Sequence, residues 1–219
     1  MTGLERSAQP AGRSRAGSER RTKTRAKVLD AAERLMAVDL DWDRLRVEDI
    51  AAEANVSPAS IYTHFGTKAG VVAAAVQRVL VGAAEAMRGA YGSDGSEMDR
   101  IEASGVAYMR LLLDHPVIAR YMIAGGPTPP SDSATHDNIR ALTDELRTEL
   151  ENLIQHAMES GEIEPVDSRL MSYFLFGSWN GVAAMSQPAG SPLSSTDAEK
   201  AIQQAIRVIR RGLDSRRSR

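Results

Sequence analysis

Residues 47–65, VEDIAAEANVSPASIYTHF, have the pattern of two short helices joined by a tight turn. Their apolar residues recur at helical spacing and predict one buried seam, formed by Ile50, Ala51, Val56, Ile61 and Phe65. Asn55 stands where the first helix must end, and Asn tolerates the left-handed backbone that such a turn requires. Ser57 is placed to cap the second helix, and Pro58 would be its first residue, where a missing N–H is harmless.

The outer face of the second helix carries small or hydrogen-bonding side chains and no carboxylate. These residues are Ala59, Ser60, Tyr62, Thr63 and His64. A helix with such a face can enter the major groove of DNA and touch base edges and phosphates. The alternative is an ordinary helical hairpin whose polar face meets water, so the rest of the sequence has to decide between the two.

The composition is that of an ordinary globular protein and favours helices. The 219 residues suffice for one large or two modest domains, with 42% hydrophobic and 26% charged residues. Aromatic residues make up only 5%, so Ala, Leu, Val and Met supply most of the apolar mass. The absence of cysteine excludes structural disulfides, thiol redox sensing and cysteine zinc sites.

No segment of the sequence has the pattern of a signal peptide or a membrane span. The N-terminus lacks an apolar core, and the best apolar run, residues 69–87, is interrupted by Gln77, Arg78 and Glu85. We therefore expect a cytoplasmic protein without a membrane partner.

Charge is distributed unevenly along the chain, although the net charge is only −2. Residues 1–27 contain eight Lys or Arg residues and two acidic residues, whereas residues 28–219 carry a net charge of −8. A basic arm on an acidic body is typical of a localised phosphate-binding surface. A solvated tail without a function is the competing interpretation.

Helical periodicity predicts an all-α fold of about nine helices. Besides the two helices within residues 47–65, these helices cover residues 20–38, 68–89, 97–113, 116–123, 132–160, 167–187 and 196–213. We expect residues 1–19 to form a disordered basic arm, residues 20–66 a helix-turn-helix domain, and residues 67–215 a larger helical domain. Trp42 should be a packing residue under the first three helices.

The last two predicted helices expose more apolar surface than one chain is expected to cover. The helix over residues 167–187 is apolar nearly all round, so it must be covered on every side. We infer that these two helices pair with their copies in a two-fold homodimer. Burial inside a single monomer is the competing reading.

Residues 20–70 resemble the N-terminal DNA-binding domain of the TetR family of bacterial transcriptional regulators. The resemblance rests on VLDAAERLM in the first helix and on VEDIAAEANVSPASIYTHFGTKAGV after it. The most recognisable family pattern is Tyr–x–x–Phe, a small residue, Ser or Thr, and Lys, which is met here by residues 62–68. The resemblance covers about a quarter of the chain, and the remainder agrees only in its helix order and count.

This resemblance implies a homodimeric protein that binds a palindromic DNA operator, usually as a repressor, and that a small molecule in the second domain releases. Carried over by position, the residues facing the groove would be Ser57, Ala59, Ser60, Tyr62, Thr63 and His64. Tyr62 and His64 would touch phosphates, as would Lys68 at the start of the fourth helix and Arg25 from the first. Family members often have Ser or Thr before the second helix, where this chain has Arg46. Its charge could make the phosphate contact, but its capping role is in doubt.

The expected effector site is a pocket between the central helices of the second domain. Candidate lining residues are Tyr108, Met109, His115, Tyr121, Met122, Phe174, Trp179, Asn180 and Met185. Such a set suits a small, mostly apolar ligand, although each residue could instead be plain core. Ligand binding should move the long helix after Lys68 and so change the separation of the two recognition helices.

Two other classes of function remain open. A helical enzyme is disfavoured, because the four histidines are scattered and no nucleophile–base pair, phosphate loop or metal-ligand spacing occurs. We accordingly expect neither a cofactor nor a metal. A DNA-binding regulator controlled by a protein partner, without a small-molecule ligand, would be favoured by a second domain that is completely filled.

If the basic arm binds phosphates, deletion of residues 1–19 should weaken binding to all DNA sequences and flatten its salt dependence, because fewer counterions are released. The measurement is the slope of log affinity against log salt concentration for the full chain and the truncated chain. An unchanged slope would show that the arm is idle.

Overall fold

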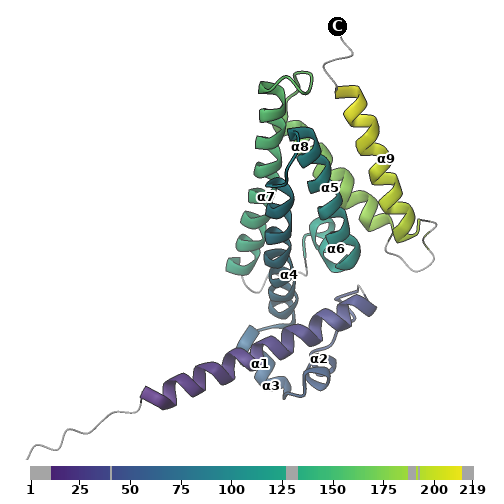
Figure 1. Ribbon diagram of the computed structural model, residues 1–219. Helices are drawn as coiled ribbons and strands as arrows, with labels where there is room; N and C mark the ends of the chain where they lie inside the picture. The colour runs from purple at the N-terminus through teal and green to yellow at the C-terminus, as the bar shows by residue number, and fades with distance from the viewer. Residues whose placement is uncertain (1–10, 40, 127–132, 187–190, 192, 214–219) are drawn as a thin grey trace, which may run out of the picture.

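The computed structural model describes residues 11–39, 41–126, 133–186, 191 and 193–213, and within them the chain forms nine α-helices and no strand. The helices are α1 (Ala11–Val38), α2 (Val47–Ala54), α3 (Pro58–Phe65), α4 (Lys68–Tyr91), α5 (Glu97–Asp114), α6 (Pro116–Ala124), α7 (Ser133–Glu159), α8 (Ser168–Met185) and α9 (Ser195–Leu213). This confirms the predicted all-α class. In Figure 1, α1, α2 and α3 form a base, and α4 rises from it into a bundle with α5 to α9.

Helix α1 begins at Ala11, whereas the sequence pattern predicted a start near Arg20 and a disordered arm before it. The preceding residue is Pro10, and residues 11–19 contain neither proline nor a β-branched residue, although Gly12 and Gly17 disfavour a helix. Burial does not explain the extension, because residues 17–23 are all exposed. Residues 1–10, the rest of the predicted arm, lie outside the described residues.

The helix–turn–helix geometry follows from the local signals in the sequence. Asn55 ends α2 in the left-handed conformation, with a φ of 53°. The Ser57 hydroxyl oxygen accepts a hydrogen bond from the backbone N–H of Ser60 at 3.2 Å, and Pro58 is the first residue of α3. Ile50 and Ile61 are completely buried. The predicted caps and the predicted apolar seam are therefore confirmed.

Helix α4 connects the two parts of the molecule. The Thr67 hydroxyl oxygen caps it by accepting the backbone N–H of Gly70 at 3.1 Å. A side chain at Gly70 would place its Cβ 2.2 Å from the Phe65 carbonyl oxygen, so this position requires glycine. Helix α4 is the one described helix that is long and apolar enough to cross a membrane, but 71% of the relevant window is buried by protein. Its apolar faces pack against α1, α5 and α7.

Trp42 lies in the connector between α1 and α2 and is only 3% exposed. Its ring meets the edge of Tyr121 in α6, with 6.3 Å between the ring centroids. The Arg120 guanidinium lies over the indole ring at 4.2 Å and pairs with Asp41 at 3.1 Å. Trp42 is thus a packing residue, as predicted, but its aromatic partner belongs to the second domain.

A second set of ion pairs joins α1 to α4. The two ends of the Arg78 guanidinium meet Asp30 and Glu33 of α1, each at 2.8 Å. We call the residues of two sets of contacts, the ion pairs between α1 and α4 and the contacts between the connector and α6, the domain joint. They are Asp30, Glu33, Asp41, Trp42, Arg78, Arg120 and Tyr121. The domain joint therefore holds the bundle against the base at two separate places.

Substitution of Trp42 by alanine should destabilise the protein by about 3–5 kcal/mol, because it removes a fully buried aromatic ring and leaves a cavity. The free energy of unfolding, measured by urea denaturation, checks this value. Val38→Ala is a matched control at the end of α1, where the side chain is 89% exposed, and should change stability by less than about 0.5 kcal/mol. Equal effects of the two substitutions would contradict the packing role of Trp42.

Candidate nucleic-acid interface and effector pocket

Helix α3 presents one side to solvent because the opposite side is anchored by Ile61. We call the predicted set Ser57, Ala59, Ser60, Tyr62, Thr63 and His64 the recognition surface. Four of its members are exposed, and Ser60 and His64 are half-buried. Tyr62, a large side chain, is 51% exposed on this helix. The structure therefore brings the six predicted residues together on one short, rigidly capped element.

Local hydrogen bonds use part of the polar capacity of the recognition surface. The Thr63 hydroxyl donates to the Ala59 carbonyl oxygen at 2.8 Å, so this hydroxyl proton is engaged within the helix. The Ser57 oxygen accepts the Ser60 N–H, and its own hydroxyl hydrogen is not used in that bond. The aromatic side chains Tyr62 and His64 are long enough to reach beyond the backbone, as contacts with a phosphate require.

Basic residues from three elements stand next to α3. The Arg25 guanidinium of α1 lies over the Phe65 ring at the end of α3, 4.6 Å from its centroid. Lys68 starts α4 and donates its ammonium hydrogen to the Asp43 carbonyl oxygen at 3.1 Å. Arg46 precedes α2, which packs on α3; it makes no side-chain cap, and its Nε lies 3.6 Å from Glu48. Arg46 therefore does not replace the capping Ser or Thr of the family pattern.

The remainder of this domain is acidic, which limits where DNA could approach. Residues 28–68 contain four basic and eight acidic residues. Arg34, one of the four basic residues, is paired with Glu53 of α2 at 2.8 Å. Attraction for a polyanion must therefore come largely from α1 before Val28 and from the cations around α3.

Of the predicted effector residues, Tyr108, Met109 and Trp179 are core residues of the second domain and are at most 2% exposed. Asn180 donates from its amide nitrogen to the Tyr108 hydroxyl at 3.2 Å. Burial raises the pKa of Tyr108 to about 12, so its hydroxyl is neutral at ordinary pH. Met109 is packed among the same helices. These residues form an aromatic and apolar core with one internal polar pair.

Tyr121 and Met122 lie in α6, at the other end of the bundle. The Tyr121 hydroxyl hydrogen-bonds to Nδ1 of His136 in α7. Burial raises the pKa of Tyr121 to about 12, so its hydroxyl is neutral at ordinary pH. Tyr121 thus connects α7 to Trp42 of the connector, which makes it a member of the domain joint rather than of a common pocket with Trp179.

Two of the predicted pocket residues are largely exposed. Phe174 is 58% exposed and Met185 is 68% exposed, so within one chain most of each side chain faces solvent. Helix α8 is apolar all round, and its sequence periodicity therefore could not show which face is turned inward. His115, between α5 and α6, is also exposed.

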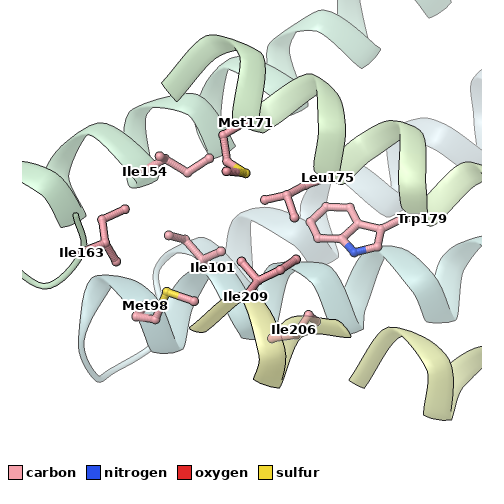
Figure 2. Close-up of a pocket in the computed structure, with 9 residues that line it drawn as sticks. All are labelled: Met98, Ile101, Ile154, Ile163, Met171, Leu175, Trp179, Ile206 and Ile209. Carbon is pink, nitrogen blue, oxygen red and sulfur yellow. The ribbon is translucent and has the colours of Figure 1, made fainter. Parts of the chain in front are cut away.

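The structure contains a small closed cavity between α5, α7, α8 and α9 (Figure 2). It measures about 20 Å³ and is lined only by apolar side chains, namely Met98, Ile101, Ile154, Ile163, Met171, Leu175, Trp179, Ile206 and Ile209. Trp179 is the one lining residue that the sequence predicted. The others were missed because isoleucine and leucine at helical spacing have the same pattern whether they fill a core or surround a cavity.

A larger, open hollow of about 550 Å³ lies between α1, α4 and α5. Its lining includes Glu33 and Arg78 of the domain joint, His115, and the small residues Gly82 and Ala107. His115 is the only predicted effector residue among those that line it. The nine predicted residues are therefore distributed over the core, the domain joint, the outer face of α8 and this hollow, and they do not line one common pocket.

Two family models match the chain. The model described as bacterial regulatory proteins of the tetR family matches residues 28–75. The model described as the tetracyclin repressor-like C-terminal domain matches residues 94–213, more than half of the chain. The chain belongs to the TetR family. It is accordingly a DNA-binding transcriptional regulator, and members of this family are regulators rather than enzymes.

Solved structures of other proteins share the fold of this TetR-family chain. A protein of unknown function from Rhodococcus sp. RHA1 has a TM-score of 0.70 at 22% identity, over 87% of this chain and 95% of the other. The ketosteroid transcriptional regulator KstR2 of Mycobacterium tuberculosis has a TM-score of 0.68 at 20% identity, over 87% and 94%. The fatty acid degradation regulator FadR from Bacillus halodurans has a TM-score of 0.65 at 18% identity, over 83% and 96%. No curated protein matches the sequence.

No group of three or more potential metal-ligating side chains occurs among the residues that the structure describes.

Arg25→Gln and Lys68→Gln should each weaken binding to every duplex. Each loss of a phosphate contact should flatten the slope of log affinity against log salt by about 0.9. Arg34→Gln removes the same charge from the same domain, but from a residue that is paired with Glu53, and should leave the slope unchanged. Equal slopes for the three variants would contradict the assignment of Arg25 and Lys68 as phosphate contacts.

Proposed function

We propose that this protein is a repressor that binds a palindromic operator as a homodimer and leaves it when a small, mostly apolar effector binds. The observation that carries the proposal is the recognition surface, a set of carboxylate-free side chains on a rigidly capped α3. A helix of this kind fits the major groove of DNA, and its side chains can contact base edges.

In this proposal the recognition surface divides its work between bases and phosphates. Ala59, Ser60 and Thr63 are short and reach base edges, where an alanine methyl suits a thymine methyl and hydroxyls accept or donate hydrogen bonds. Tyr62 and His64 reach phosphates and set the register. Ser57, Arg25, Arg46 and Lys68 add contacts to the backbone on either side of the groove.

Homodimerisation is supported by the outer face of α8. Leu170, Tyr173, Phe174 and Met185 are large apolar or aromatic residues and are all well exposed. Between them, added Cβ atoms at Gly177 and Gly181 would meet nothing within 4 Å, so another helix could approach closely there. An exposed apolar stripe of this kind marks an interaction surface, and a two-fold axis through α8 and α9 makes it self-complementary. The paired α3 helices would then read half-sites about 34–36 Å apart.

An apolar effector is supported by the cavity between α5, α7, α8 and α9. Its lining contains no polar side chain, and Met98 and Met171 have flexible thioether chains that can move to admit a ligand. Two structurally similar regulators are named for ketosteroids and for fatty acid degradation, and both names refer to apolar molecules. Because the cavity measures about 20 Å³, the effector must enlarge it, and this enlargement would separate helices that also form the dimer surface.

The small size of that cavity also favours a second candidate. A regulator controlled by a protein partner needs no internal ligand space, and a nearly filled apolar site is what such a protein would show. A small-molecule screen on the DNA complex distinguishes the two, since only the first candidate releases DNA without a second protein. For both candidates we place the protein in the cytoplasm, where it meets DNA.

Selection of bound duplexes from a random pool tests the proposal directly. The full chain should enrich an inverted repeat and bind it with two protomers per duplex, as measured by sedimentation. A ligand screen on the enriched duplex then follows the loss of binding. A protein that stays monomeric, or that enriches no inverted repeat, would refute the proposal.

Phe174→Glu should convert the dimer to monomers and abolish operator binding, because it buries an unpaired charge at the proposed interface. Sedimentation and a DNA-binding assay measure the two effects. Val81→Glu is the matched control, since Val81 is 49% exposed on α4, a helix that packs on α5 and α7 and not closely on α8, and it should leave the dimer intact. Dimers that persist in Phe174→Glu would remove α8 from the interface.

A further inference from the structure

Helix α1 continues well beyond the domain that it helps to build. Val28 is the first buried residue of its described side chains, and every side chain from residue 17 to residue 23 is exposed. Residues 11–27, which we call the helical arm, would span about 25 Å at the rise of an α-helix. In Figure 1 the free end of α1, drawn in purple, extends past α3 with no other helix beside it. The side chains of residues 17–23 therefore do not contribute to the packed core.

The helical arm is strongly basic. Residues 17–27 contain five basic residues and one acidic residue, Glu19. At helical spacing, Arg20, Lys23 and Lys27 fall on one face, and Arg21 and Arg25 fall on another. Like charges four residues apart on a helix repel one another, so the pairs Arg21–Arg25 and Lys23–Lys27 destabilise the isolated helix and are compensated when an anion binds.

The direction of the helical arm is fixed at its base by the recognition helix. Arg25 stacks on Phe65, the last residue of α3. The free end of the arm lies in Figure 1 on the side of the molecule where α2 and α3 lie, away from α7 and α9. A duplex that receives α3 in its groove would therefore pass close to the arm.

We infer that the helical arm is a second DNA-binding element that lies against phosphates outside the half-site read by α3. The inference rests on the proposed function. A length of about 25 Å corresponds to roughly seven base pairs at 3.4 Å each, so each arm extends the contacted duplex by that amount. These contacts carry no sequence information, because phosphates are the same in every flank.

Flank length provides the first test. The full chain is titrated with two kinds of duplex that contain the inverted repeat enriched in the selection. One kind ends at the inverted repeat, and the other is extended at each end, in steps, by up to 15 base pairs of arbitrary sequence. Affinity should rise with flank length and level off near seven base pairs, whatever the flanking sequence.

The triple variant Arg20→Gln, Arg21→Gln and Lys23→Gln should lose this gain. On long duplexes, each variant arm should reduce the slope of log affinity against log salt concentration by about 2.7. For each variant arm, the loss of affinity between 50 and 200 mM salt should then be roughly 40-fold smaller. The control variant Arg88→Gln, Arg110→Gln and Arg140→Gln makes the same charge change at exposed positions of α4, α5 and α7, outside the proposed dimer helices, and should bind like the wild type.

The Ser18 position tests whether the arm must be a helix. Ser18→Pro keeps every charge but breaks the helix within the arm, whereas Ser18→Ala preserves it. The gain from flanks should shrink in Ser18→Pro and persist in Ser18→Ala. Because residue 18 lies outside the packed part of α1, thermal unfolding of the body should be the same in both variants.

The outcomes of these tests distinguish a failure of this inference from a failure of the proposed function. A protein that binds no enriched duplex refutes the proposed function and with it the inference. A protein that binds flush and extended duplexes equally refutes the inference alone. Equal behaviour of Ser18→Pro and Ser18→Ala would show a flexible polycation instead of a helical arm and would also overturn it.

Discussion

The contact between the buried Trp42 side chain and α6 is the one on which the function of this fold depends, because it joins the three-helix base to the bundle. Besides this contact, the three-helix base is attached to the bundle through α4, the ion pairs of Arg78 and the contacts between α1 and α6. At the Trp42 contact, Arg120 is held between the indole ring and the Asp41 carboxylate. The hydrogen bond from Arg120 holds the pKa of Asp41 below its usual value of 3.8, so the pair stays charged at physiological pH. The base therefore follows any movement of α6.

The same contact connects the base to the long helix α7. Tyr121 touches Trp42 on one side and His136 on the other. A change in the packing of the bundle thus reaches the base through two routes, the continuous helix α4 and the chain of rings from α7 through α6. Two routes restrict the base to few orientations, which suits the proposed homodimer, whose two recognition helices must match a fixed half-site spacing.

Features set by neighbouring residues were predictable from the sequence, and features set by distant packing were not. Asn55, Ser57 and Thr67 act through hydrogen bonds or dihedral angles within a few residues, and the helix ends that they predict agree with the structure. The exposure of Phe174 could not be predicted, because the inward face of an all-apolar helix is determined by the helices that pack on it. The partner of Trp42 could not be predicted because nothing near it in the sequence specifies α6. The start of α1 was missed because composition alone was taken as a sign of disorder.

The close approach at Gly70 has a mechanical consequence. With no room for even a methyl group between α4 and the Phe65 carbonyl, the corner between α3 and α4 cannot bend independently of either helix. Helix α4 has 24 residues and is about 36 Å long, so a tilt of about five degrees displaces its far end by roughly 3 Å relative to the corner. Helices α3 and α4 then move as one rigid body. A slight tilt of the bundle therefore shifts α3 by a distance comparable to the rise of one base pair.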